Sequence, residues 1–223
     1  MVTTVYAVRH AQAKGNLDKV FQGRYDGQLT DLGYEQLDKL AQRCASLGLE
    51  AIYSSPLSRA YETAQAVNRH YGYPIHCEDG LLEINGGDWE GQKWASFEQS
   101  DPKQNYNWYH APWDFCAPNG EPMTQVYDRM KETVCRIVSE NMGKTIAVVS
   151  HGCALCNLIT FAKGKPVTQM DRRDICDNTS LTKIVFDEHL IPHLEWENDS
   201  SHLDGDLKVS VTELWNHSGS GKE

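Results

Sequence analysis

The sequence predicts an α/β fold, a three-layer sandwich in which helices cover both faces of a mostly parallel central sheet. Two observations predict it. Strand-like and helix-like segments alternate along the chain, which is typical of a parallel sheet enclosed by helices. In addition, residues 145–149 read TIAVV, an uninterrupted apolar run that indicates a central parallel strand covered on both faces. At 223 residues the chain is long enough to bury a large core.

The first strand and the first helix open this alternation. Residues 3–8 have the composition of a strand, and an amphipathic helix is expected from Thr30 to about Leu47. The Thr30 side chain can cap its N-terminus, and Gly48 can end it. Its apolar face at helical spacing consists of Leu37, Leu40, Ala41, Cys44 and Leu47.

A short strand at 50–54 and a second helix follow. We expect this helix to open at Ser55 and Pro56, because a cap followed by proline is favoured at the first helical position. Gly72 is expected to end it. Its apolar face consists of Leu57, Ala60, Tyr61, Ala64, Val67 and Tyr71.

The second half of the chain completes the sheet. Residues 84–121 are rich in Trp, Asn, Asp, Gly and Pro and are expected to be irregular. A long helix is predicted at about 123–142, and a shorter one at about 154–162. Two final strands, near 181–186 and 193–197, are expected to form a hairpin at one edge of the sheet.

Composition argues against several classes of partner. The chain has 21 Lys and Arg against 31 Asp and Glu, a formal net charge of −10. Such a surface disfavours nucleic-acid backbones and anionic membranes. No run approaches the roughly 18 apolar residues of a membrane span, and residues 1–20 lack a signal-peptide pattern. An anionic substrate would therefore need a local basic pocket.

Seven cysteines, an odd number without a secretion signal, predict reduced thiols and a cytoplasmic protein. Cys153 and Cys156 form a C-x-x-C pair, but no second pair completes a zinc site, and both fall in an apolar helical pattern. Core packing is therefore the favoured interpretation. We expect a single domain at 1–216 with an aromatic cap inserted at about 84–121, and a flexible tail at 217–223.

Basic residues follow three of the predicted strands. Arg9 and His10 end the first strand, Arg59 lies in the first turn of the helix after the second, and His151 follows the central strand. Each could be an ordinary surface or strand-end residue. Because the carboxyl ends of parallel strands meet at one edge, where ligands of such sheets bind, we expect all four side chains to converge on one pocket.

The chemistry that suits this pocket is phosphoryl transfer. Arginine binds phosphate oxygens through two N–H groups, and helix N-termini favour anions. A neutral histidine among these groups can attack phosphorus. The leaving alkoxide also needs a proton, for which Glu83 is the candidate and Glu62 and Glu90 are alternatives that spacing alone cannot separate.

Four segments of the chain carry a family resemblance. In chain order they read VRHAQAKGN, SSPLSRAYETA, LLEINGGDWEG and VVSHGCAL. They resemble the signature segments of the histidine phosphatase superfamily, the phosphoglycerate-mutase-like enzymes. Similarity extends to QGRYDGQLTDLG and, more weakly, to the closing strands that begin at NTSLTKIVF. The resemblance implies this family's fold and a phosphohistidine mechanism.

The resemblance also implies roles for individual residues. His10 corresponds to the nucleophile, and Glu83, rather than the two rival glutamates, to the proton donor. Asn16 and Gln22 match positions near the phosphoryl group or the pocket mouth. No metal and no cofactor are implied. The implied phosphate pocket comprises Arg9, His10, Arg59 and His151.

One position departs from the family pattern. Ala11 and Gln12 follow the Arg-His pair, where the family usually has Gly followed by Glu or Gln. A methyl group at residue 11 limits the approach of the backbone and disfavours positive φ. No catalytic group is lost, so we expect activity, but the pattern does not determine the detailed geometry of this loop.

A phosphatase is favoured over a mutase by residues 92–121. The family's mutases resemble one another in an insertion here, with an Arg pair that holds a second acidic group, whereas this segment has no arginine. Its many aromatic residues suit a substrate with a flat or apolar body, or a cap packed on itself. We therefore expect a metal-independent phosphatase acting on a small phosphorylated metabolite. The alternatives are a phosphomutase and a non-catalytic phosphate-binding scaffold.

Overall fold

The computed structural model describes residues 1–209, so the tail predicted at 217–223 lies outside the described residues. One six-stranded sheet has the order β3-β2-β4-β1-β5-β6. Neighbouring strands from β3 to β1 are parallel, whereas β5 is antiparallel to both of its neighbours. The strands are β1 Thr3–Arg9, β2 Ala51–Ser54, β3 Ile75–Cys77, β4 Thr145–Ser150, β5 Leu181–Phe186 and β6 Pro192–Asp199.

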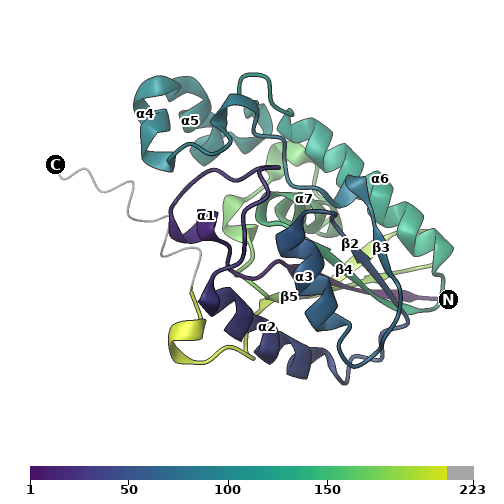
Figure 1. The fold of residues 1–223 in the computed structure, drawn as a ribbon. Helices are drawn as coiled ribbons and strands as arrows, with labels where there is room; N and C mark the ends of the chain where they lie inside the picture. Colours follow the sequence, from purple (N-terminus) through teal and green to yellow (C-terminus); the bar gives the residue numbers. More distant parts are fainter. Residues whose placement is uncertain (210–223) are drawn as a thin grey trace.

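Helices cover both faces of this sheet, which confirms the predicted fold class (Figure 1). The first core lies between the sheet and α6 and α7, and the second between the sheet and α2 and α3. The helices are α1 Lys14–Leu17, α2 Asp31–Cys44, α3 Ser58–Val67, α4 Phe97–Ser100, α5 Pro102–His110, α6 Met123–Glu140 and α7 Gly152–Ala162.

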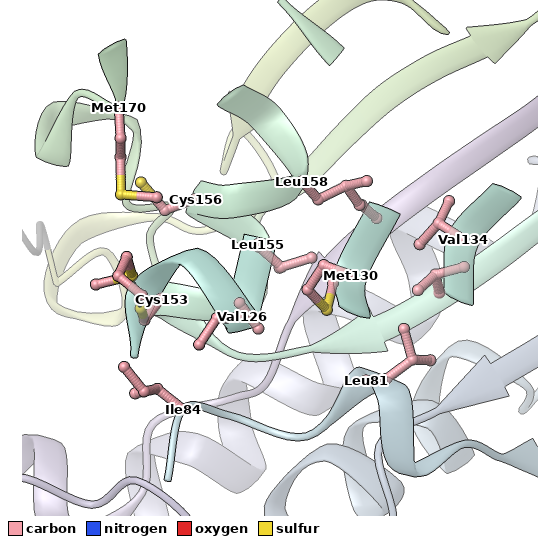
Figure 2. Close-up of a cluster of buried hydrophobic side chains, with 14 of the residues drawn as sticks. Leu81, Ile84, Val126, Met130, Val134, Cys153, Leu155, Cys156, Leu158 and Met170 are labelled. Atoms are coloured by element: carbon pink, nitrogen blue, oxygen red, sulfur yellow. Dashed lines mark hydrogen bonds between the residues drawn. The ribbon is translucent and has the colours of Figure 1, made fainter. Parts of the chain in front are cut away.

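The apolar run of β4 explains its central place. Ile146 and Val148 pack into the core under α6 and α7, whereas Ala147 and Val149 pack into the core under α2 and α3. All four are fully buried, and burying a Val or Ile side chain contributes roughly 1.5–3 kcal/mol. Figure 2 shows the first of these cores, where side chains of α6 and α7 meet between the two helices.

Most element boundaries differ from the predicted ones by a few residues. The Thr30 hydroxyl caps α2 as predicted, accepting a hydrogen bond from the Gly33 N–H at 3.0 Å. The predicted opening of α3 at Ser55 and Pro56 is wrong, because the helix begins at Ser58. The Asp26 carboxylate, distant in sequence, accepts from the Ser58 N–H and hydroxyl at 2.9 and 2.8 Å and so caps this helix instead.

Residues 84–121 are more regular than predicted. They contain α4, α5 and several single 3₁₀ turns. The start of α5 has a recognisable signal, since the Asp101 carboxylate accepts from the Gln104 N–H at 3.3 Å and Pro102 occupies the first turn. In Figure 1 these two short helices lie on the side of the molecule toward which β1 runs. Strand β3 was not expected from the sequence, because it has only three residues, two of them exposed.

Candidate active site

The ends of β1 and β4 lie side by side and bring the predicted basic residues together. Arg9 pairs with Ser150 in the parallel ladder, and the His10 N–H donates to the Ser150 carbonyl at 3.0 Å. His151 follows directly, and its ring centroid lies 5.2 Å from that of His10. Six of the seven predicted site residues line one pocket: Arg9, His10, Asn16, Gln22, Arg59 and Glu83. His151, which was predicted to line it too, lies behind this lining and is completely buried.

The imidazole of His10 is held in one tautomer. Its Nδ1 lies 2.7 Å from the carbonyl oxygen of Ala11, which can only accept, so Nδ1 carries the proton and Nε2 has a free lone pair. Burial lowers the pKa of His10 well below its usual value, and the positive charges of Arg59 and Arg9 lower it further. The ring is therefore neutral at pH 7, the form in which histidine is a nucleophile.

The two arginines are anchored by backbone carbonyls. Arg59 donates from Nη2 to the Gly23 carbonyl at 2.7 Å and from Nη1 to the Tyr25 carbonyl at 2.8 Å, and Arg9 donates to the Cys176 carbonyl. Burial lowers the pKa of Arg59 to about 10, so it stays charged at neutral pH. The buried Nε atoms of both arginines have no partner among the described residues. A phosphate oxygen can satisfy such donors.

His151 is completely buried and precedes the first turn of α7. Its Nε2 lies 2.7 Å from the Ser55 hydroxyl, whereas its Nδ1 is buried without a partner in the described part of the chain. Burial lowers the pKa of His151 well below its usual value, and the charge of Arg59 lowers it further. His151 is thus a second neutral imidazole next to His10.

Glu83 is held by the N-terminus of α7. Its two carboxylate oxygens accept from the N–H groups of Cys153 at 3.0 Å and Ala154 at 2.9 Å, and from that of Ile84 at 3.0 Å. The Cys153 and Ala154 N–H groups belong to the first turn of α7 and have no acceptor within the helix. The helix therefore fixes Glu83 at the wall of the pocket that also contains His10.

The rival glutamates are engaged elsewhere and do not line the pocket. Glu62 accepts a hydrogen bond from the Tyr34 hydroxyl at 3.0 Å on the exposed side of α3. Glu90 accepts from the N–H groups of Arg24 at 2.8 Å and Gly86 at 2.9 Å, which ties two loops together. The geometry thus favours Glu83 as the carboxyl group nearest to the chemistry.

Asn16 and Gln22 line the pocket from the segment after β1. The Asn16 side chain accepts from the Ala13 N–H at 3.0 Å and so braces α1. The side-chain oxygen of Gln22 is buried without a partner among residues 1–209. A Cβ atom at Gly15 would lie 2.2 Å from the Gln22 side chain, so glycine is required there for Gln22 to reach its position.

Ala11 fits the loop where the family usually has glycine. Ala11 does not have a positive φ, so its methyl group causes no backbone strain. The residue is fully buried, and its N–H donates to the Thr63 hydroxyl at 3.0 Å. Its carbonyl holds His10 as described above. The departure from the family pattern therefore leaves the nucleophile's surroundings intact.

Sequence reasoning missed the segment before β5. The Asn178 side chain donates to the His10 carbonyl at 2.8 Å, and the Thr179 N–H donates to the Arg9 carbonyl at 3.1 Å. Thr179 has a φ of 56°, which is rare for a β-branched residue. The sequence predicts the segment that begins with Asn178, Thr179 and Ser180 only as the start of the closing strands. Nothing in a short motif indicates a contact with a backbone atom so far away in sequence.

A partly buried ion pair behind Glu83 was also missed. The Glu121 carboxylate accepts from Arg129 Nε at 2.7 Å and Nη2 at 3.0 Å. Arg129 donates further to the carbonyls of Leu82 at 2.7 Å and Glu83 at 3.1 Å. The pair therefore fixes the backbone of the loop that carries Glu83.

A sheet whose strand ends present a neutral histidine beside two buried arginines belongs to a phosphate-handling enzyme. A family model of the histidine phosphatase superfamily (branch 1) matches residues 5–199. The chain belongs to this superfamily, as its sequence motifs predict.

Relatives and solved structures agree with this assignment. Phosphoserine phosphatase 1 of Hydrogenobacter thermophilus is 29% identical over 81% of this chain and 85% of its own length. "Probable phosphoglycerate mutase GpmB" of Escherichia coli O1:K1 is 31% identical over 90% of this chain and 94% of its own. The structure of Bacillus stearothermophilus YhfR has a TM-score of 0.86 and 34% identity, covering 91% of this chain and all of that one.

Membership of this family and its phosphatase relatives confirm the prediction of a phosphoric monoester hydrolase. Within residues 1–209, no helix is both long enough and apolar enough to cross a membrane. The predicted cytoplasmic location stays a prediction.

Proposed function

We propose that this protein hydrolyses small phosphate monoesters without a metal ion, through a phosphohistidine at His10. The observation that carries the proposal is the state of the His10 ring. Its Nδ1 is bonded to the Ala11 carbonyl, its pKa is held low by burial and two arginines, and it lines the pocket with them. A neutral ring with a free Nε2 lone pair beside two cations is suited to attack a phosphate dianion.

In the first step, His10 Nε2 forms a bond to phosphorus as the bond from phosphorus to the ester oxygen breaks. The electron pair of the broken bond goes to the leaving oxygen, which takes a proton from the Glu83 carboxyl group. Arg9 and Arg59 offer the transferring group their buried Nε–H donors. Such fixed donors stabilise the charge on its equatorial oxygens better than water does.

In the second step, water attacks the phosphorus of phospho-His10. Glu83 accepts a proton from this water, so the general acid of the first step is the general base of the second. The bond from phosphorus to nitrogen breaks, its electron pair returns to Nε2, and inorganic phosphate leaves. Enzyme and protons are thereby restored, and the net reaction consumes one water.

Metal independence is part of the proposal. The positive charge that a metal would bring to the phosphoryl group is supplied by Arg9 and Arg59, both of which line the pocket. Within the described residues, no group of three His, Cys, Asp or Glu side chains is arranged to hold a metal ion. Phosphoryl transfer requires mainly positioning and charge stabilisation, which fixed guanidinium groups can provide.

A mutase is the second candidate, because one relative has a mutase name. A mutase must hold its substrate by a second acidic group while phospho-His10 returns the phosphoryl group to another hydroxyl. None of the basic side chains of residues 92–121 lines the pocket that contains His10. Lys93 donates to the carbonyl of Asp18 at 2.8 Å at the surface, and Lys103 and His110 are exposed. This favours transfer to water.

The decisive experiment follows the covalent intermediate in the presence of EDTA. The protein is mixed with p-nitrophenyl phosphate, quenched rapidly, and digested at neutral pH for mass spectrometry. We expect steady turnover in EDTA and one phosphate on the peptide that contains His10. Phosphate on His151, or activity that requires added Mg²⁺, would overturn the mechanism. Binding of inorganic phosphate without turnover would indicate a scaffold, and faster interconversion of phosphoglycerates than hydrolysis would indicate a mutase.

A further inference from the structure

The pocket that contains His10 has a second set of lining residues, which are apolar. They come from the segment after β1, from the Glu83 loop, from residues 94–108 and from the turn before Cys176. This apolar set consists of Val20, Phe21, Ile84, Trp94, Trp108 and Ile175. The charged lining residues are needed for the phosphoryl group, and this set offers an apolar surface to the rest of a substrate.

The aromatic part of this set is fixed by packing. The Phe21 ring centroid lies 4.8 Å from that of Trp94 and 5.4 Å from that of Trp108, and the two indoles are 5.2 Å apart. Next to them, Trp89 and Phe97 stack at 3.7 Å and are almost completely buried. Such rings cost little conformational entropy on binding a ligand, because they are already ordered.

Hydrogen bonds tie this aromatic cluster to the segment after the nucleophile. The Phe21 N–H donates to the Gln92 carbonyl at 2.9 Å, and the Trp94 N–H donates to the Lys19 carbonyl at 3.0 Å. Val20 and Lys93 form a β-bridge between the same two segments. The aromatic residues of the apolar set are therefore held in a fixed position relative to the segment that follows His10.

Cations near the apolar set are already engaged. Arg24, next to the lining residue Gly23, contacts the Glu121 carboxylate at 3.4 Å. Arg172 lies over the ring faces of Trp108 and Tyr109, at 4.9 and 4.8 Å from their centroids. Among the lining residues the cations are Arg9 and Arg59. A carboxylate on the leaving group would lose its hydration against indole rings and find no free counter-charge in the lining.

We propose that the leaving group of the preferred substrate is an uncharged alcohol with a flat or bulky apolar body, held against Phe21, Trp94 and Trp108. The inference rests on the proposed function, since it concerns the other half of the same pocket. Burial of apolar surface against these rings stabilises the bound ester and its transition state together. Specificity therefore comes from apolar contact rather than from recognition of a second acid.

The test compares primary alkyl phosphates, so that alkoxide basicity changes little. The series is ethyl phosphate, 2-phenylethyl phosphate and the phosphate ester of 3-hydroxypropanoate. We expect kcat/KM for 2-phenylethyl phosphate to exceed that of ethyl phosphate by about tenfold or more, equivalent to about 1.4 kcal/mol. The kcat/KM for the phosphate ester of 3-hydroxypropanoate should be lower than that for ethyl phosphate. A kcat/KM for the phosphate ester of 3-hydroxypropanoate that equals or exceeds that for 2-phenylethyl phosphate would overturn the inference.

Two variants test whether the preference comes from the aromatic residues of the apolar set. Trp94→Ala should lower the ratio of the phenylethyl to the ethyl kcat/KM by about fivefold, because Trp94 lines the pocket and is only partly buried. Tyr106→Ala removes an aromatic ring that is 62% exposed and does not line the pocket, so it should leave the ratio unchanged. An unchanged ratio in Trp94→Ala, or an equal fall in both variants, contradicts the assignment.

Failure of this inference can be told apart from failure of the proposed function. If no phosphate ester is hydrolysed and His10 is never phosphorylated, the proposed function itself is wrong. If all three esters are hydrolysed through phospho-His10 but the phosphate ester of 3-hydroxypropanoate is preferred, only the inference is wrong. In that case Arg172→Gln should abolish the preference for the acid, because Arg172 is the cation stacked on the pocket residue Trp108.

Discussion

The side-chain amide of Asn178, just before the neighbouring strand β5, holds the backbone of His10 by donating to its carbonyl oxygen at 2.8 Å. Asn178 itself is almost completely buried. His10 therefore has two restraints of different kinds, one on its ring from the Ala11 carbonyl and one on its main chain from Asn178. A nucleophile restrained in this way loses little entropy when it reaches the attacking geometry.

Removing the Asn178 restraint should slow the chemical step. Asn178→Ala is expected to lower kcat by about tenfold, equivalent to about 1.4 kcal/mol, with a smaller change in KM and a slower appearance of phospho-His10. Asn141→Ala is the matched control, because Asn141 is also buried and hydrogen-bonded but precedes β4, at the other end of the sheet. Both variants should lose stability, but equal losses of kcat would show that Asn178 is only structural.

Glu83→Gln should affect substrates according to their leaving groups. An alkoxide needs a proton to leave, whereas p-nitrophenolate does not, so kcat/KM should fall by about 10²-fold or more on an alkyl phosphate and much less on p-nitrophenyl phosphate. Glu62→Gln is the control, since Glu62 contacts Tyr34 outside the pocket, and both rates should persist. Equal losses on both substrates in Glu83→Gln would remove Glu83 from the acid role.

Arg59→Lys should not be conservative. The arginine donates to the Gly23 and Tyr25 carbonyls and still has a buried Nε–H for the phosphoryl group. These donors leave from three separate nitrogens of one plane, and the single nitrogen of lysine cannot reach all three acceptors. We expect kcat/KM to fall by about 10- to 100-fold, or ~1.4–2.7 kcal/mol. Arg69→Lys, at a half-exposed arginine paired with Asp38, should retain activity. Activity near that of the wild type in Arg59→Lys would refute its place in the pocket.

Stability should fall in mild acid because of two histidines. His10 and His151 have pKa values well below 6.5 in the folded protein, chiefly because of burial, whereas in the unfolded chain they take up protons near pH 6.5. The unfolded state then binds more protons, so this contribution is complete above pH 6.5 and is lost as pH falls below it. Each histidine can contribute up to about 1.4 kcal/mol per pH unit.

Urea unfolding at several values between about pH 7.5 and pH 5 measures this slope. His10→Asn removes one of the two groups and should make the free energy of unfolding less dependent on pH in this range. A slope that does not change in His10→Asn would mean that His10 does not stay neutral in the folded state.

The sheet and the meeting of the basic residues were predictable because burial determines them. A strand covered on both faces needs an apolar run such as that of β4, and the carboxyl ends of parallel strands share one edge. Strand β3 and helix α5 were missed, since three residues carry too little pattern and α5 lies in a segment whose Trp, Asn and Gly content favours loops. The Asp-Pro pair at the start of α5 was a usable signal.

The parts of the site that the sequence did not reveal depend on backbone atoms. Arg59 is anchored by the carbonyls of Gly23 and Tyr25, and Asn178 contacts the carbonyl of His10. Every residue has a carbonyl, so the identity of the accepting residue carries no information about such contacts. Glu121 and Arg129 are different, because they form a pair of side chains, but Glu121 precedes α6, and no helical spacing indicates a contact between a residue outside a helix and one within it.

Cys153 is one of the residues that line the pocket with Glu83, and burial raises the pKa of its thiol well above the usual value. The same cause raises the pKa of Cys156 well above the usual value and that of Cys176 to about 11. Since peroxide oxidises the thiolate and not the thiol, these sulfurs are poor targets for oxidants. If His10 is the nucleophile, as proposed, the enzyme should keep its activity under oxidative stress that would inactivate a phosphatase whose nucleophile is a thiolate.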